Sequence, residues 1–252
     1  MAQAGNIVLL ILGSYLLGSL PVGLWVGRRW KGLDVRQFGS GNIGATNVGR
    51  VCGPVAGGFV LVCDVLKGLL PPMAGAAMDL SSPWQILAAL VAILGHNYSV
   101  WLCFKGGKGI ATSLGALLGI APPVALTALL LFGIEILLLR WVSLGALLGA
   151  FSLPVLMPLY YPGDGFRLAF GVLACILAVL RHRSNIQRLL AGTEPRVHLP
   201  WSGRSDADKP VSTSVQQTGV TPSGTSELRD IAMTDQSEIA EHSRDTQTHA
   251  TR

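Results

Sequence analysis

Charged residues are scarce in this chain of 252 residues, of which only 13% are Asp, Glu, Lys or Arg whereas 50% are hydrophobic. A soluble domain of average composition carries about 25% charged residues. The shortage excludes a typical cytosolic enzyme and an intrinsically disordered chain, because neither an ordinary globular surface nor a solvated coil can be made from so few charges. The remaining class is a protein that crosses a membrane several times.

Cysteine is scarce as well, with four residues that form no Cys-x-x-Cys pair and have no His at zinc-ligand spacing. This arrangement excludes a disulfide framework and gives no sign of a metal site. We expect the four cysteines to be small apolar residues.

Acidic residues are missing chiefly from the first part of the chain. Residues 1–202 contain 14 Lys and Arg but only 6 Asp and Glu, whereas residues 203–252 contain 5 and 8. The basic residues lie in short gaps between apolar runs, which indicates membrane topology and an anionic substrate rather than nucleic acid. The Ser/Thr/Gln-rich remainder has no apolar period. We therefore predict a membrane-embedded domain over 1–202 and a disordered polar tail over 203–252.

Long apolar runs are abundant, and about 20 apolar residues suffice to cross the hydrocarbon core. The predicted spans are Ile7–Gly27, Pro54–Met78, Trp84–Phe104, Ile110–Ala121, Val124–Leu139, Val142–Tyr160 and Phe166–Leu180, with Pro122-Pro123 dividing the fourth from the fifth. The positive-inside rule then places the N-terminus outside and the C-terminus in the cytoplasm. The predicted fold is an all-α, polytopic integral membrane protein of about seven transmembrane helices.

Loop one, residues 39–50, is a glycine-rich segment between the first two spans. It contains Ser40, Gly41, Asn42, Gly44, Thr46 and Arg50. Glycines allow a close approach to a ligand, and backbone N–H groups with hydroxyls and a guanidinium form an anion site. The glycines also fit the dinucleotide pattern GxGxxG, but no strand precedes them, so a plain connector is the more serious alternative.

Loop two, residues 104–109, contains Lys105, Gly106, Gly107 and Lys108 and follows Gly95-His96. Two lysines on a glycine-rich backbone form a cationic phosphate contact, although topogenic charge is an alternative.

Loops three and four lie nearer the C-terminus. Loop three, residues 143–145, contains Ser143, which on its own could simply help helices to pack. Loop four, residues 181–186, contains His182 and Asn185, which share a helix face if the helix continues. Arginines on both sides favour a neutral imidazole, and an anchor for anionic lipid is the alternative.

Three charged residues fall within the apolar runs, namely Asp64, Lys67 and Glu135. Such charges are candidates for function by default. Asp64 and Lys67 are spaced i,i+3, so we expect an ion pair that orders loop one. Glu135 lies about one turn from Arg140, near the membrane surface.

Taken together, these segments resemble the bacterial acyl-phosphate-dependent glycerol-3-phosphate acyltransferases of the PlsY type. The matching pieces are GSGNIGATNVGR at 39–50, DVLKG at 64–68, GH at 95–96, FKGGKGIAT at 104–112, VSLG at 142–145 and HRSNIQRLLAGTEPR at 182–196. The resemblance covers about residues 10–196. The chain departs from it at Asn97–Trp101, where the family is richer in Phe and Pro, and at Ala146, where Ser is common.

The resemblance implies an enzyme of the bacterial inner membrane, with its active site facing the cytoplasm. It implies transfer of an acyl group from acyl phosphate to the 1-hydroxyl of glycerol 3-phosphate, without metal or other cofactor. It also implies a functional link to the enzyme that makes acyl phosphate. Seven residues match the family's active-site positions, namely Ser40, Thr46, Arg50, Lys108, Ser143, His182 and Asn185. We expect Lys108, His182, Asn185 and Ser143 to be catalytic. From the chemistry of the loops, we expect the named residues of loop one with Lys105, Gly106 and Gly107 to bind phosphate.

The expected mechanism is direct attack on the acyl carbonyl without an acyl-enzyme. Lys108 and Arg50 neutralise the leaving phosphate, and His182 either orients the acceptor or serves as general base. A small-anion transporter and a non-catalytic lipid-binding scaffold are the alternative functions.

Overall fold

The computed structural model describes residues 2–197 of the chain. Within these residues every regular element is a helix and no strand occurs, which confirms the predicted all-α class. The predicted tail over 203–252 lies outside the described residues. The helices are α1 (Ala2–Ser19), α2 (Val22–Lys31), α3 (Ala45–Cys52), α4 (Pro54–Ala77), α5 (Ser82–Asn97), α6 (Ile110–Ile120), α7 (Pro122–Leu138), α8 (Val142–Tyr160), α9 (Gly165–Arg181) and α10 (Arg183–Leu190), with 3-10 turns at Val35–Gln37 (η1) and Val100–Leu102 (η2).

Several of these helices are long and apolar enough to cross a membrane. They are Gln3–Lys31, Pro54–Ala77, Ser82–Leu102 and Val142–Tyr160, and α9 with α10 forms a fifth candidate that is bent by 62°. The apolar helices α6 and α7 are shorter, with 11 and 17 residues. The multi-pass class is thereby confirmed, whereas seven crossings and their orientation stay predictions.

Prolines set two of the breaks between helices. The predicted division near Pro122-Pro123 is confirmed, because α6 ends at Ile120 and α7 begins at Pro122. The prediction missed a second break, between α1 and α2 at Leu20-Pro21. Proline has no N–H to donate and disfavours a helical conformation in the residue before it. The apolar composition of 7–27 concealed this interruption.

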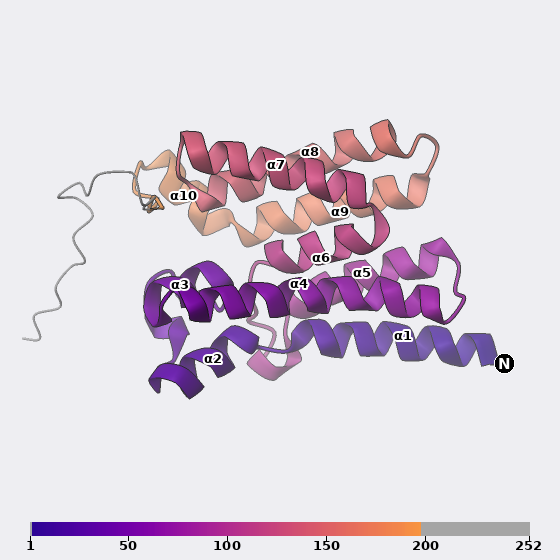
Figure 1. Ribbon diagram of the computed structural model, residues 1–252, viewed down its shortest axis with the longest axis horizontal. Helices are drawn as coiled ribbons and strands as arrows, with labels where there is room; N and C mark the ends of the chain where they lie inside the picture. Colours follow the sequence, from indigo (N-terminus) through magenta and orange to yellow (C-terminus); the bar gives the residue numbers. More distant parts are fainter. Residues whose placement is uncertain (1, 198–252) are drawn as a thin grey trace, which may run out of the picture. The chain divides into compact units, whose positions relative to one another are not determined.

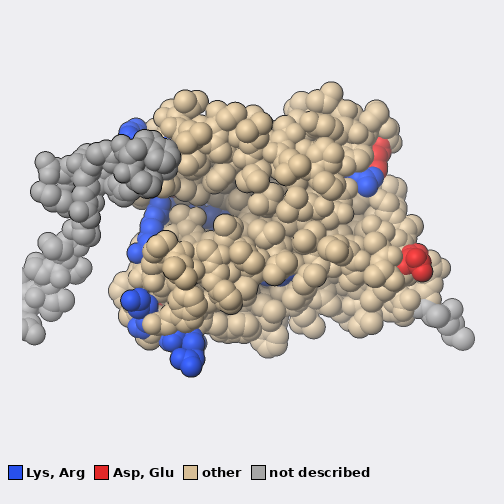
Figure 2. Space-filling model, in the orientation of Figure 1, with Lys and Arg blue, Asp and Glu red and all other residues tan. Residues whose placement is uncertain are grey.

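The helices form two groups joined by α6 (Figure 1). Helices α1, α4 and α5 contact one another, α8 contacts both α7 and α9, and α6 contacts members of both groups. The short helices α2, α3 and α10 lie together at one end of the bundle. Lys and Arg side chains gather at this end, as Figure 2 shows.

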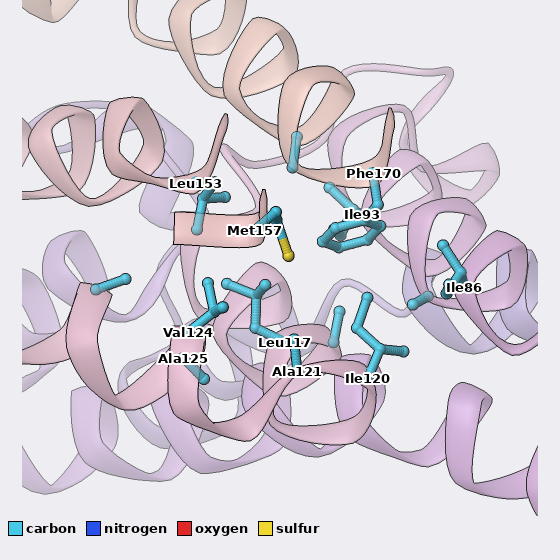
Figure 3. Packing of buried hydrophobic residues seen from close by; sticks show 14 residues of the cluster. Ile86, Ile93, Leu117, Ile120, Ala121, Val124, Ala125, Leu153, Met157 and Phe170 are labelled. Carbon is cyan, nitrogen blue, oxygen red and sulfur yellow. The ribbon is translucent and has the colours of Figure 1, made fainter. Parts of the chain in front are cut away.

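A buried apolar cluster holds the two groups together (Figure 3). It brings Ile93 of α5, Leu117 of α6, Val124 of α7, Met157 of α8 and Phe170 of α9 into one packed layer. All five side chains are at most 4% exposed. The packed layer thereby joins α5 and α6 to α7, α8 and α9.

Glycines allow the backbones of neighbouring helices to touch. A Cβ atom on Gly18 of α1 would lie 2.2 Å from the carbonyl oxygen of Ala92 on α5, and one on Gly68 of α4 would lie 2.0 Å from that of Thr112 on α6. No side chain fits at either position. These two glycine seams have the small-residue packing that is typical of membrane helices.

Candidate active site

Loop one folds around the buried side-chain amide of Asn47. Its Nδ2 donates to the carbonyl oxygens of Val35 (2.9 Å), Phe38 (3.1 Å) and Asn42 (2.9 Å), and its Oδ1 accepts from the backbone N–H of Ser40 (2.8 Å). One side chain therefore ties residues 35–42 to the start of α3. Asn47 lies within the glycine-rich motif, but nothing in the spacing of that motif identifies its four partners.

The groups that loop one offers to a ligand are side chains more than backbone amides. The amides of Ser40, Gly41 and Gly44 are bonded to Asn47 Oδ1, Phe38 O and Asn42 Oδ1. The expected anion nest of free amides is therefore not present at these three residues. Ser40, Thr46 and Arg50 are exposed, and the first N–H groups of α3 have no intrahelical partner by helix geometry.

Loop two is fastened to the end of α5 and to α9. The amides of Gly106 and Gly107 donate to the carbonyl oxygens of Asn97 (3.2 Å) and His96 (3.0 Å). Their own carbonyl oxygens accept from Arg181, at 2.7 and 2.9 Å. The two glycines thus shape the loop, and their amides are not free for the expected donation to phosphate. Lys105 is exposed.

Loop four is a kink, not a continuous helix. Helix α9 ends at Arg181 and α10 begins at Arg183, at 62° to it. The condition under which His182 and Asn185 were expected to share a face is therefore not met. The kink instead brings the Asn185 side chain to loop two, where its Oδ1 accepts a hydrogen bond from Lys108 Nζ at 2.5 Å.

Glu194 completes this arrangement, although it was not among the predicted site residues. Its two carboxylate oxygens accept from Asn185 Nδ2 (2.6 Å) and Arg188 Nε (2.7 Å). Burial raises the pKa of Glu194, but hydrogen bonds from Asn185 and Arg188, with a contribution from the nearby Ser143 hydroxyl, outweigh it and hold that pKa below its usual value. Glu194 thus remains an anion and fixes which end of the Asn185 amide faces Lys108.

Lys108 is the centre of the site's electrostatics. Burial lowers the pKa of its ammonium group, the Glu194 carboxylate opposes that shift, and Arg188, Arg50 and Arg181 lower the pKa further, to about 8. Arg50 therefore lies near enough to act on Lys108 by charge, which connects loop one to loops two and four. Cations that repel one another in a half-buried site form a receptor for an anion.

His182 is buried beside these cations and is held in one orientation. Its Nδ1 lies 2.8 Å from the carbonyl oxygen of Ala178, an acceptor, so Nδ1 carries the proton and Nε2 has a free lone pair. Burial and then the charge of Lys108 lower the pKa of the imidazole to about 4. The expected neutral state follows, with burial as a larger cause than the flanking arginines.

Loop three lies at the start of α8, where Ser143 is buried. Its hydroxyl lies near Glu194 and helps to lower the pKa of that carboxyl, but it forms no hydrogen bond with any group of residues 2–197. A Cβ on Gly145 would lie 2.7 Å from Glu135 Oε2. Glu135 is therefore a packed neighbour of this helix start, and Ser143 is the polar group that faces the site without a partner of its own.

The expected ion pair inside the apolar region is present. Lys67 Nζ lies 2.8 Å from Asp64 Oδ1, and both side chains are buried. Lys67 also donates to the carbonyl oxygen of Leu20 at 3.1 Å, and His96 faces Asp64. The pair thus contacts the α1–α2 break and α5, not the loop-one residues that we expected it to order.

Lys108, Asn185, His182, Ser143 and Arg50 therefore come together at one end of the bundle. Lys105 is exposed, and its side chain makes no hydrogen bond or ion pair with the part of the chain that the structure describes. Within residues 2–197 no three His, Cys, Asp or Glu side chains converge as metal ligands do. The site's chemistry rests on cations, hydroxyls and one neutral imidazole.

The chain is similar in sequence to a known protein family and to several of its members. A family described as glycerol-3-phosphate acyltransferase matches residues 8–192. A glycerol-3-phosphate acyltransferase of Synechococcus sp. (strain JA-2-3B'a(2-13)) is 46% identical over 200 residues, which cover 77% of this chain and 96% of that protein. One of Desulforamulus reducens is 43% identical over 190 residues, which cover 75% and 94%.

A solved structure is similar in fold as well as in sequence. It is the crystal structure of PlsY (YgiH), an integral membrane glycerol 3-phosphate acyltransferase, in its glycerol 3-phosphate form. The TM-score is 0.72 at 37% identity, over 76% of this chain and 96% of that chain. A second structure of that protein, in a lysophosphatidic acid form, gives a TM-score of 0.70.

Proposed function

The chain belongs to the glycerol-3-phosphate acyltransferase family, and from that membership we propose the donor, the site residues and the chemistry of its reaction. It is an integral membrane enzyme that transfers an acyl group to glycerol 3-phosphate. The donor we propose is acyl phosphate, and the products are 1-acylglycerol 3-phosphate and inorganic phosphate. A transporter and a lipid-binding scaffold, the two alternative functions, do not account for this membership.

The observation that carries the proposal is the chain of contacts from Lys108 through Asn185 to Glu194, with Arg188 and Arg50 around it. Donor and acceptor each carry a phosphate, so the site has to hold two anions close together. Lys108, Arg50 and the hydroxyls of Ser40 and Thr46 provide the positive charge and the donors for them. The donor also carries a lipid tail, which accounts for a site at one end of a membrane-embedded helix bundle, where the tail can remain in the lipid.

The proposed step is a direct displacement. The 1-hydroxyl oxygen of glycerol 3-phosphate forms an ester bond to the acyl carbon, and the bond from that carbon to the phosphate oxygen breaks. The hydroxyl proton passes to the leaving phosphate. Lys108 stabilises the charge that develops on that phosphate, and Asn185 holds Lys108 in place.

The identity of the proton acceptor follows from comparing two bases. The pKa of His182 is lowered to about 4, whereas the second pKa of a phosphate group is about 6. The phosphate is the stronger base, so we assign the proton to it. His182 Nε2 accepts a hydrogen bond from the 2-hydroxyl of glycerol 3-phosphate and so orients the acceptor, which leaves the proton of the attacking 1-hydroxyl free to pass to the phosphate. Ser143 donates to a substrate oxygen.

The deciding assay is turnover by the purified protein in detergent. Acyl phosphate and glycerol 3-phosphate are supplied together, and released phosphate and lysophosphatidic acid are measured. We expect equal amounts of both products with acyl phosphate and none with acyl-CoA. Turnover with acyl-CoA alone would overturn the donor, and an acylated Ser or Cys trapped from acyl phosphate without acceptor would overturn direct attack.

The site residues are tested with matched variants. We expect Lys108→Ala and Arg50→Ala each to lower kcat/KM by about 100-fold or more, the usual cost of losing one preorganised charge contact. Arg183→Ala is the control, because Arg183 is an exposed cation next to His182. An equal loss in the control would show that general positive charge, not the assigned contacts, supports activity.

We also propose a location in the bacterial inner membrane, with this end of the bundle in the cytoplasm, where an enzyme that makes acyl phosphate would supply the donor. The support is the gathering of Lys and Arg at the end with α2, α3 and α10 (Figure 2). Labelling with a membrane-impermeant maleimide tests the orientation. We expect Asp79→Cys to react in intact spheroplasts and the exposed Cys103 to react only in inverted vesicles.

A further inference from the structure

A buried imidazole lies directly beneath loop two. His96 is in the last turn of α5, is 4% exposed and belongs to none of the contacts assigned to the reaction. Its backbone carbonyl accepts the N–H of Gly107, and the carbonyl of the next residue, Asn97, accepts the N–H of Gly106. The end of α5 and loop two are therefore joined at two consecutive residues.

The side chain of His96 is in contact with the loop as well. A Cβ atom on Gly107 would lie only 2.1 Å from His96 Nε2. A Cβ on Gly106 would meet a different atom, the His96 carbonyl oxygen, at 2.0 Å. The ring thus supports Gly107 in particular, and Gly107 is the residue before Lys108.

The other edge of the ring faces the buried ion pair. His96 Nδ1 lies 3.7 Å from Asp64 Oδ1, which is beyond hydrogen-bond distance, and Nδ1 has no hydrogen-bond partner within residues 2–197. Asp64 is paired with Lys67, which donates to the carbonyl oxygen of Leu20 at the α1–α2 break. Burying an ion pair in an apolar layer is costly, and the chemistry of the acyl transfer gives this pair no task.

We propose that His96 is a positioning residue for the acyl-transfer reaction, with one edge of its ring facing the Asp64–Lys67 pair and the other edge supporting the loop that carries Lys108. The inference rests on the proposed role of Lys108. Lys108 Nζ reaches Asn185 Oδ1 at 2.5 Å, and a displacement of the loop by about 1 Å breaks that contact. Misplacement of this size can lower a rate about 100-fold.

The test is a double-mutant cycle between the ring and the glycine above it. His96→Asn keeps a polar group facing Asp64 but removes the ring atoms Cε1 and Nε2. We expect Gly107→Ala to lower kcat about 100-fold, with a much smaller change in KM for glycerol 3-phosphate. In the His96→Asn background, Gly107→Ala should lower kcat by only about tenfold or less, because the added methyl group then has room.

Gly106→Ala provides the matched control. Its methyl group meets a backbone carbonyl oxygen, which no substitution of the His96 side chain removes. We therefore expect the cost of Gly106→Ala to be the same in both backgrounds. The proposal is overturned if His96→Asn reduces the kcat loss of both alanine variants equally, or if it reduces the loss of neither.

A second measurement does not depend on acyl transfer. Modification of the Lys108 amine by trinitrobenzenesulfonate is followed by mass spectrometry, with the exposed Lys105 as internal reference. We expect Gly107→Ala to change the Lys108 rate relative to Lys105 and the double variant to restore it. If the protein lacked acyltransferase activity but this coupling appeared, the proposed function would fail while the positioning role stood.

A variant that does not fold is recognised by two further measurements. Thermal unfolding and elution volume are measured for every variant, and His96→Ala repeats the cycle if His96→Asn does not fold. Wild-type kcat and wild-type Lys108 modification in a folded His96 variant would show that the ring does not position the loop.

Discussion

The alkaline limit of the reaction should be set by Lys108. Its pKa is lowered to about 8, by burial first and by three nearby arginines. If only the ammonium form stabilises the leaving phosphate, activity is present below that pKa and is lost as pH rises through it. About nine-tenths of the enzyme is active at pH 7 and about one-tenth at pH 9, so kcat/KM should fall about tenfold between them.

The assay is the initial rate of phosphate release at low substrate concentration, because kcat/KM reports the free enzyme. The second pKa of phosphate groups is about 6, so the charge of both substrates is nearly constant above pH 7.5. Two variants sharpen the result. Lys108→Arg keeps its charge throughout, and we expect a lower rate with no alkaline loss.

The second variant is Glu194→Gln, which keeps hydrogen-bonding groups but removes the charge that raises the pKa of Lys108. We expect the alkaline loss to move to lower pH. A profile that is flat from pH 7 to pH 9.5 in the wild-type enzyme, or an alkaline loss that persists in Lys108→Arg, would refute the reasoning, since Lys108 would then not be the titrating group.

Three further changes test other parts of the structure. Asn47→Ala removes four hydrogen bonds of a buried amide and should destabilise the protein by about 2–4 kcal/mol, measured by thermal unfolding in detergent; an unchanged unfolding temperature would contradict this role. Lys67→Met leaves Asp64 buried without its partner and should lower the free energy of unfolding by about 3–5 kcal/mol. Lys67→Met combined with Asp64→Asn should lower it clearly less, because no unpaired charge is then buried. Equal losses of unfolding free energy in the two variants would argue against an ion pair. Ser143→Ala removes a buried hydroxyl that has no hydrogen-bond partner within residues 2–197, so we expect unchanged stability with activity at least about tenfold lower, and full activity would remove Ser143 from the site.

Most helix positions were predictable because a membrane helix is defined by composition and by breaks. Apolar length located α4 and α8, and the proline pair located the division between α6 and α7. The break at Pro21 was missed because the surrounding run stays apolar on both sides. Helix α3 was missed because it has only eight residues, too few to give an apolar run, and because it lies between two glycines in a segment that was expected to be a loop.

The members of the site were easier to predict than their partners. Lys108 and Asn185 were named from motif resemblance, but their hydrogen bond joins residues 77 positions apart. Arg181 was one of the basic residues of loop four, for which an anchor for anionic lipid was the alternative, and only the fold shows that it donates to the carbonyl oxygens of Gly106 and Gly107. Glu194 lay within the quoted motif, yet its task is visible only once Asn185 and Arg188 turn toward it.

The glycine seams at Gly18 and Gly68 have a consequence for how this protein can change over time. Each seam is a contact between main chains, so it admits no larger residue and offers no side chain whose replacement could compensate. The outward positions, such as the exposed Val55 and Leu130, leave room for other apolar side chains. The spacing of α1 against α5 and of α4 against α6 is therefore set by main-chain contact, and substitutions fit on the outside of the bundle but not at the two glycines.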